Sequence, residues 1–151
     1  MSLKIDVKGV NVVLKDLDRY SDNVKKEIVQ EVKEWSERVE SKAQTDVPVD
    51  TGALRSSIRA VGTQDTLTWI VKAGGINGVN YAPYIEFGTG AFVNQSFLQE
   101  FGLVNYARQF KGAGVKQVNL PQREFLYRNA RTEFDKTRKN IIEILRKNGK
   151  G

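Results

Sequence analysis

The sequence contains no histidine and no cysteine in 151 residues, and only three prolines and one methionine. Without cysteine there can be no disulfide, iron–sulfur cluster or thiolate zinc site. Without histidine the chain lacks the commonest general base, the usual metal ligand and every Ser–His or Cys–His pair. These absences argue against an enzyme, and we expect neither catalysis nor a bound metal or cofactor.

Long apolar runs are also missing. No stretch approaches the roughly 18 apolar residues of a membrane span, and the N-terminus MSLKIDVKGV lacks the apolar core of a signal peptide. Apolar residues make up 40% and charged residues 28%, the balance of a globular protein. We expect a single domain over residues 1–151, with an irregular loop at about 91–120 and a frayed tail at 148–151. The protein should be made in the cytoplasm, away from membranes.

The net charge of +6 is unevenly distributed. Residues 122–151 hold nine Lys and Arg against four Asp and Glu, while the rest of the chain is nearly neutral. A basic C-terminal segment can contact nucleic acid or an acidic partner. The alternative is a solvated helix face whose late cations complement the helix dipole. The sequence alone leaves both open.

Apolar periodicity predicts the first half of the fold. Alternation in residues 2–8 predicts a strand, and residues 10–20 favour a short helix. From Asp22 to about Asp46, apolar residues recur every three or four positions, which predicts a long amphipathic helix capped by Ser21 or Asp22. Pro48 should end this helix. Its apolar stripe consists of Val24, Ile28, Val32, Trp35, Val39 and Ala43.

The second half should contain a hairpin and a second long helix. Residues 57–62 and 67–73 look like two strands joined by the polar turn 63–66, with Leu67, Trp69, Val71 and Ala73 on one face. Residues 91–120 are irregular and aromatic, and we expect them to order against a neighbouring subunit; the alternative is that they fold back on their own core. The final helix, at about 125–147, has the apolar stripe Leu126, Ala130, Phe134, Thr137, Ile141, Ile144 and Leu145.

Two long helices and a few sequence-adjacent strands, without repeated strand–helix–strand crossovers, predict an α+β domain. The sheet should be small and antiparallel, packed by two long amphipathic helices on one side. We expect the two apolar stripes to dominate stability.

Candidate catalytic groups are few. Glu86 could in principle face Asp50 or Asp46 as a carboxylate pair, but nothing in the sequence fixes their separation. Ser56 or Ser57 would need a lysine such as Lys72 as base. The glycine-containing segments lack the Gly-Lys-Ser/Thr ending of a phosphate loop, and no calcium loop is present. A hydrolase is therefore the weakest interpretation.

Three short motifs, in order, point to a family. PVDTGALRSSI (48–58) follows the first long helix, YAPYIEFGTG (81–90) follows the hairpin, and PQREFLYRNA (121–130) opens the last helix. In order and spacing the chain resembles the tail-completion or neck proteins of long-tailed bacteriophages, small virion proteins at the head–tail junction. It departs from their pattern at Glu124, where a proline commonly precedes Phe-Leu, and in the length of the loop at 91–120.

The resemblance implies a fold like that of tail-terminator and tail-to-head joining proteins, and no catalysis. It implies a virion protein, assembled in the host cytoplasm as a homo-oligomeric ring, usually hexameric, at the head-proximal end of the tail; a monomer in solution would be compatible. The implied partners are head-completion or connector proteins and tail-tube or tail-terminator proteins, with a passing contact with DNA. The implied motif and interface residues are Asp50, Thr51, Gly52, Leu54, Arg55, Tyr81, Tyr84, Glu86, Phe87, Gly88, Thr89, Pro121, Phe125 and Leu126.

The chemistry of these residues suits a structural role. Asp50 or Thr51 can cap a turn, and Gly52 can adopt backbone angles that other residues avoid. We expect Glu86 to pair with Arg55 or with backbone amides near Gly88, within a subunit or across the ring; the alternative is an exposed glutamate. The rings of Tyr81, Tyr84 and Phe87 should be buried, within one subunit or between two. The rival function is a nucleic-acid-binding module that uses the basic C-terminal helix, although no DNA or RNA motif is present.

Overall fold

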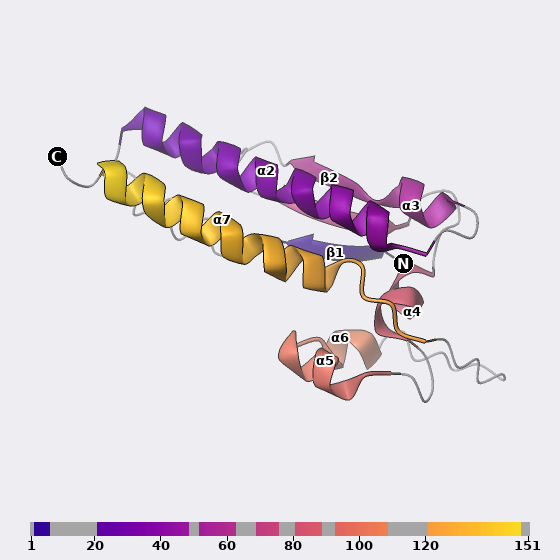
Figure 1. Ribbon diagram of the computed structural model, residues 1–151. Helices are drawn as coiled ribbons and strands as arrows, with labels where there is room; N and C mark the ends of the chain where they lie inside the picture. Colours follow the sequence, from indigo (N-terminus) through magenta and orange to yellow (C-terminus); the bar gives the residue numbers. More distant parts are fainter. Residues whose placement is uncertain are drawn as a thin grey trace.

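The structure, a computed structural model, describes residues 2–6, 21–48, 52–62, 69–75, 81–88, 93–108 and 121–148 (Figure 1). In chain order its elements are β1 Ser2–Asp6, α2 Asp22–Asp46, α3 Ala53–Ser57, β2 Arg59–Gly62, β3 Trp69–Gly74, α4 Ala82–Phe87, α5 Gln95–Glu100, α6 Val104–Arg108 and α7 Tyr127–Asn148. The expected short helix at 10–20 and the expected turn at 63–66 lie outside the described residues. The α+β prediction is confirmed.

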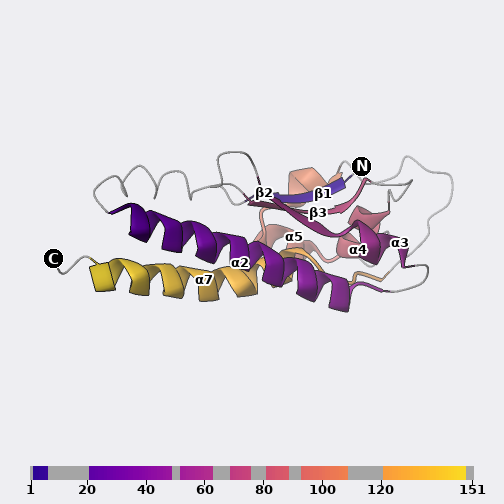
Figure 2. The same cartoon turned by 90° about the horizontal axis from the view of Figure 1, so that it is seen from above.

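The three strands form one antiparallel sheet in the order β1-β3-β2. At its centre Val71 of β3 pairs with Ile5 of β1 and Ala60 of β2. Val71 and Ala73 are buried against α2, as the alternation predicted, and Val61 on β2 is exposed. One helical layer therefore packs on one face of a small sheet (Figure 2).

Helix α2 follows its predicted stripe closely. All six stripe residues are buried, and the helix ends where Val47 turns into extended backbone ahead of Pro48. Ser21 is the N-cap residue, although its side chain makes no capping bond. The C-terminal half of the stripe, Trp35, Val39 and Ala43, packs on the sheet, so α2 connects the helical layer to the strands.

Helix α7 runs antiparallel to α2 and beside it (Figures 1 and 2). Its buried face follows the predicted stripe except at one position. Phe134 is 40% exposed and its ring meets that of Trp35 in a T-shaped contact, with 6.5 Å between the ring centroids, while Glu133 is buried in its place. The prediction that Phe134 is a core residue is wrong, because the buried stripe lies one position nearer the N-terminus at this turn.

Part of the segment at 91–120 is helical, which corrects the prediction of an irregular loop. Asn94 caps α5 by accepting a hydrogen bond from the N–H of Phe97 at 3.1 Å. Phe97 and Leu98 are buried in the main core of their own chain. The expectation that this segment orders against a neighbouring subunit is therefore wrong for residues 93–108, because their apolar side chains already have an intramolecular site.

Among the described residues the core has two unequal parts. The main cluster lies between the sheet, the end of α2 and the start of α7, and it includes Val39, Ile58 and Phe125. We call this the proximal end of the α2–α7 pair. A small satellite cluster joins Val24 and Ile28 of α2 to Ile141, Ile144 and Leu145 of α7. We call this the distal end; in both views it extends past the strands (Figures 1 and 2).

Candidate functional site

Glu86 lies at the centre of a buried joint between α4 and α7. Its side chain is 0% exposed, although glutamate is almost never fully buried without a partner. Oε2 accepts hydrogen bonds from the N–H groups of Phe125 at 2.8 Å and Leu126 at 3.0 Å, and Oε1 accepts one from Tyr127 at 2.9 Å. Tyr127 is the first residue of α7 and Phe125 and Leu126 come just before it, so the carboxyl group binds the backbone N–H groups at the start of the helix, where intrahelical partners are missing.

The backbone around Glu86 closes the joint from the other side. Pro83 occupies the first turn of α4, where a missing N–H costs nothing. Gly88 ends α4 with φ 72 and ψ 175, a conformation that disfavours a side chain. The N–H of Arg123 donates to the carbonyl of Ile85 at 2.9 Å. The segment just before α7 therefore lies against α4, although 34 residues separate Gly88 from Arg123 in the sequence.

Burial and hydrogen bonding act in opposite directions on the Glu86 carboxyl group. The pKa of Glu86 is raised from 4.5 to about 7 overall, because the loss of solvent and the nearby Glu124 raise it by more than the three backbone N–H groups lower it. A carboxyl group with this pKa changes charge near neutral pH. Both of its oxygens already bond to the protein, so the arrangement is suited to holding α7 rather than to proton transfer.

The predicted pairing of Glu86 with Arg55 is wrong. The Arg55 side chain is exposed, and its Nε donates to the carbonyl of Gln44 near the end of α2 at 2.6 Å. The alternative of an exposed Glu86 is wrong as well. The expected backbone amides are real partners, but they belong to residues 125–127 and not to the neighbourhood of Gly88.

The first motif forms a corner between α2 and the sheet. Gly52 has φ 72 and ψ −10, the left-handed conformation that the sequence predicted for it, and precedes α3. Leu54 is buried in the main core. Asp50 and Thr51, the expected capping residues, lie outside the described residues.

The aromatic motif residues separate into buried and exposed ones. Phe87 is 3% exposed and Tyr84 is partly buried against the core, as expected. Tyr81 is 40% exposed, so the prediction of a buried ring is wrong for it. In the third motif Phe125 and Leu126 are fully buried and Pro121 is exposed. Thr89 lies outside the described residues.

An aromatic cluster attaches α5 and α6 to the joint. Phe87 meets Tyr106 edge to face at 6.1 Å between ring centroids and Tyr127 at 6.0 Å, and Phe101 lies 4.7 Å from Phe97. Offset and edge-on ring pairs of this kind add stability beyond area burial. The spacing of Phe97 and Phe101, four residues apart, was the available sequence signal for α5.

Two arginines of α7 cover this cluster. The guanidinium carbons of Arg128 and Arg131 lie 5.5 and 5.2 Å from the Phe101 ring centroid. Both arginines also pair with Glu100 of α5, and Arg128 pairs with Glu124. Near the start of α7, the positive charges of Arg128 and Arg131 are therefore paired with acids of the same chain.

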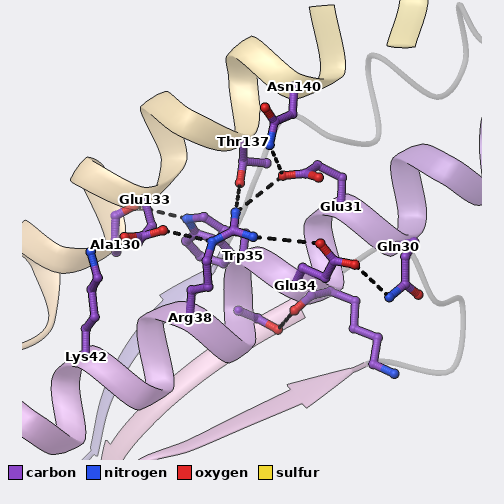
Figure 3. Close-up of polar contacts among 12 residues, drawn as sticks. Gln30, Glu31, Glu34, Trp35, Arg38, Lys42, Ala130, Glu133, Thr137 and Asn140 are labelled. Atoms are coloured by element: carbon purple, nitrogen blue, oxygen red, sulfur yellow. Dashed lines mark hydrogen bonds and ion pairs between the residues drawn. The ribbon is translucent and has the colours of Figure 1, made fainter. Parts of the chain in front are cut away.

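A second polar network, which the sequence analysis missed, fixes α7 against α2 (Figure 3). Glu133 is 4% exposed and forms ion pairs with Lys42 and with Arg38, whose Nε lies 2.8 Å from its carboxylate. Burial raises the pKa of Glu133, but Lys42 and Arg38 outweigh it and hold the pKa below its ordinary value. Arg38 also donates to the Thr137 hydroxyl at 2.7 Å. The network sets the register of the two helices.

The β2 edge of the sheet is occupied by side chains of α2. Glu40 accepts a hydrogen bond from the Ala60 N–H at 2.6 Å, and Gln44, one turn later, donates to the Ile58 carbonyl at 3.2 Å. Exposed strand edges are sites where another strand can pair. Because α2 already satisfies these two groups, strand addition at this edge is disfavoured.

Two further features are absent from the part of the chain that the structure describes. No cluster of three or more Asp or Glu side chains there could hold a metal ion. Within the same residues no helix has the length and apolar character needed to cross a bilayer.

The fold and the joint together define a small α+β structural domain whose motif residues hold helices in place. A family model described as "Bacteriophage HK97-gp10, putative tail-component" matches residues 11–88, just over half of the chain. The chain therefore belongs to this HK97-gp10-like family of bacteriophage tail components, which confirms the resemblance to phage tail and neck proteins. No curated protein and no solved structure matches the chain. The match ends at Gly88, where α4 ends and the chain departs toward α5.

Proposed function

We propose that this protein is a non-catalytic subunit of a ring, usually hexameric in such proteins, at the head-proximal end of the phage tail, where it completes the tail or joins it to the head. The membership in a tail-component family carries the proposal. The joint at Glu86 supports it, because both oxygens of this buried acid accept backbone hydrogen bonds that fix the start of α7. The proposed partners are the head-completion or connector protein and the tail-tube or terminator protein.

Tyr81 is the proposed contact between neighbouring subunits of the ring. It belongs to the second motif, yet 40% of it remains exposed on the monomer. Aromatic residues are enriched at protein interfaces because they bury a large area with few rotatable bonds. The packing of Phe87, Phe125 and Leu126 inside the chain leaves Tyr81 as the exposed aromatic side chain of the motifs among the described residues.

Loss of the gene from its phage or prophage tests the position in the virion. We expect filled heads and separate tails in electron micrographs of the lysate, and we expect purified protein added to the extract to restore joined, infectious particles. Tails of irregular length would place the ring as a terminator, and tails of normal length would place it in the neck. Joined virions of normal infectivity, or a defect confined to the tail tip, would contradict the proposal.

The Tyr81 contact is tested in the same complementation assay. Tyr81→Ala should restore few joined particles while its far-ultraviolet circular dichroism and unfolding midpoint stay close to those of the natural protein. Val61→Ala is the matched control, because Val61 is apolar, 42% exposed and outside the three motifs. Equal rescue by both variants would remove Tyr81 from the interface without affecting the proposed position of the ring.

A further inference from the structure

The C-terminal half of α7 carries a set of cations that the protein does not use internally. All of them are exposed, and within the described ranges none forms an ion pair: Lys136, Arg138, Lys139, Arg146 and Lys147. We call these five residues the distal cations. Their ammonium and guanidinium groups are therefore available to an external anion.

The N-terminal half of the same helix is different. There Arg128 and Arg131 pair with Glu100 and lie over the rings of Phe97 and Phe101. The division follows the fold, because the ion pairs and ring contacts of α5 with α7 are made by Arg128 and Arg131, near the start of α7.

The geometry suits a long anionic partner. Residues 136–147 of a straight helix extend over roughly 16 Å, and the same length of duplex DNA carries about nine phosphate charges. The distal end also projects beyond the strands in both views, so the sheet does not block its approach (Figures 1 and 2). Two exposed acids oppose the distal cations: Asp135 lies beside Lys136, and Glu143 lies among them.

We propose that the distal cations bind the phosphate backbone of nucleic acid without regard to sequence. Protein–protein interfaces are depleted of lysine and need an apolar core, but the only large exposed apolar residue between Lys136 and Lys147 is Ile142. Phosphate contacts need no apolar core, because the release of condensed counterions supplies the free energy. The inference stands apart from the proposed ring, since it rests on α7 charges and not on the motifs.

Fluorescence anisotropy with a labelled 30-base-pair duplex DNA tests the proposal on the full chain. If all five distal cations contact phosphates, the affinity should fall roughly 500-fold between 50 and 200 mM salt. The variant with Lys139→Gln, Arg146→Gln and Lys147→Gln retains two of them, so its loss over the same range should be only about tenfold. A second sequence of the same length should bind equally well.

A charge-matched control separates local contact from overall charge. Arg59→Gln, Lys72→Gln and Arg123→Gln together also remove three positive charges, from residues that form no ion pair among the described ones. This control should keep the natural affinity and salt dependence to within a few-fold, whereas Glu143→Gln should bind DNA more tightly. The proposal is overturned if both triple variants behave alike, or if polyglutamate of equal charge binds as tightly as DNA.

Discussion

The proximal and distal ends of the α2–α7 pair are built from the same two helices but differ in what surrounds them. At the proximal end the helices pack on the sheet, on α4 and on α5, and the acids Glu86 and Glu133 are buried with full sets of partners. At the distal end a few aliphatic side chains meet, and the cations of α7 stay unpaired among the described residues. The motif residues therefore stabilise the proximal end, and the distal end is left free to present charge.

The largest expected effect is at Trp35, on the proximal side. Trp35 is 2% exposed, and its Nε1 donates to the Ala130 carbonyl of α7 at 3.0 Å. Trp35→Ala should lower the free energy of unfolding by about 3 to 5 kcal/mol, measured by urea denaturation. Phe134→Ala, which removes its edge-on partner, should cost only about 1 to 2 kcal/mol because that ring is partly exposed. Equal losses would show that Phe134 is covered in solution.

Glu86→Ala should be the next most damaging change. It leaves the N–H groups of residues 125–127 without an acceptor in a buried site, at about 1 to 3 kcal/mol for each group that water cannot reach. We expect a loss of at least about 3 kcal/mol at pH 5. Glu37→Ala, at an exposed position of α2, is the control and should change stability by less than about 0.5 kcal/mol. A similarly small loss for Glu86→Ala would mean that α7 begins correctly without the joint.

The raised pKa of Glu86 predicts a pH dependence that belongs to the proximal end. Because the folded-state pKa, about 7, exceeds the unfolded value of 4.5, the folded state binds the proton more tightly. The contribution to stability is complete below pH 4.5 and is lost as the pH rises to about 7, for a total of about 3 kcal/mol. Urea denaturation across this window should show the decline in the natural protein and a flatter profile for Glu86→Gln. Parallel profiles would assign the decline to other groups.

The comparison also separates what the sequence could and could not predict. Periodicity was sufficient for α2 and for the extent of α7, because both helices repeat their apolar spacing several times, and the shorter alternation in the strands was enough to place them. It misplaced Phe134, because Phe134 and Glu133 lie on opposite edges of the apolar stripe and either could face α2. Glu133 is the buried one because it pairs with Arg38 and Lys42 of α2, and this tertiary contact is not visible in the periodicity.

The candidate site shows the same limit. The three motifs placed Glu86 among structural residues, but its partners are backbone N–H groups, which have no signature in a sequence. Arg55 was the partner for Glu86 that the sequence suggested, but its side chain bonds to the carbonyl of Gln44 instead. Helix α5 was missed because six residues give barely two turns of pattern, although the cap at Asn94 was present in the sequence.

The smallest expected effect is at the distal end. Ile144 is partly buried against Val24 and Ile28, so Ile144→Ala should cost about 1 to 2 kcal/mol, compared with about 3 kcal/mol for Ile58→Ala in the main core. Amide hydrogen exchange should show the same order, with the amides of 141–147 exchanging by local opening and those near 130–137 only with global unfolding. If the two substitutions cost the same and the amides exchange together, both ends form one cooperative unit. In that case the unpaired cations of α7 would lie on a surface as rigid as the joint at Glu86, and the stability difference between the two ends would disappear.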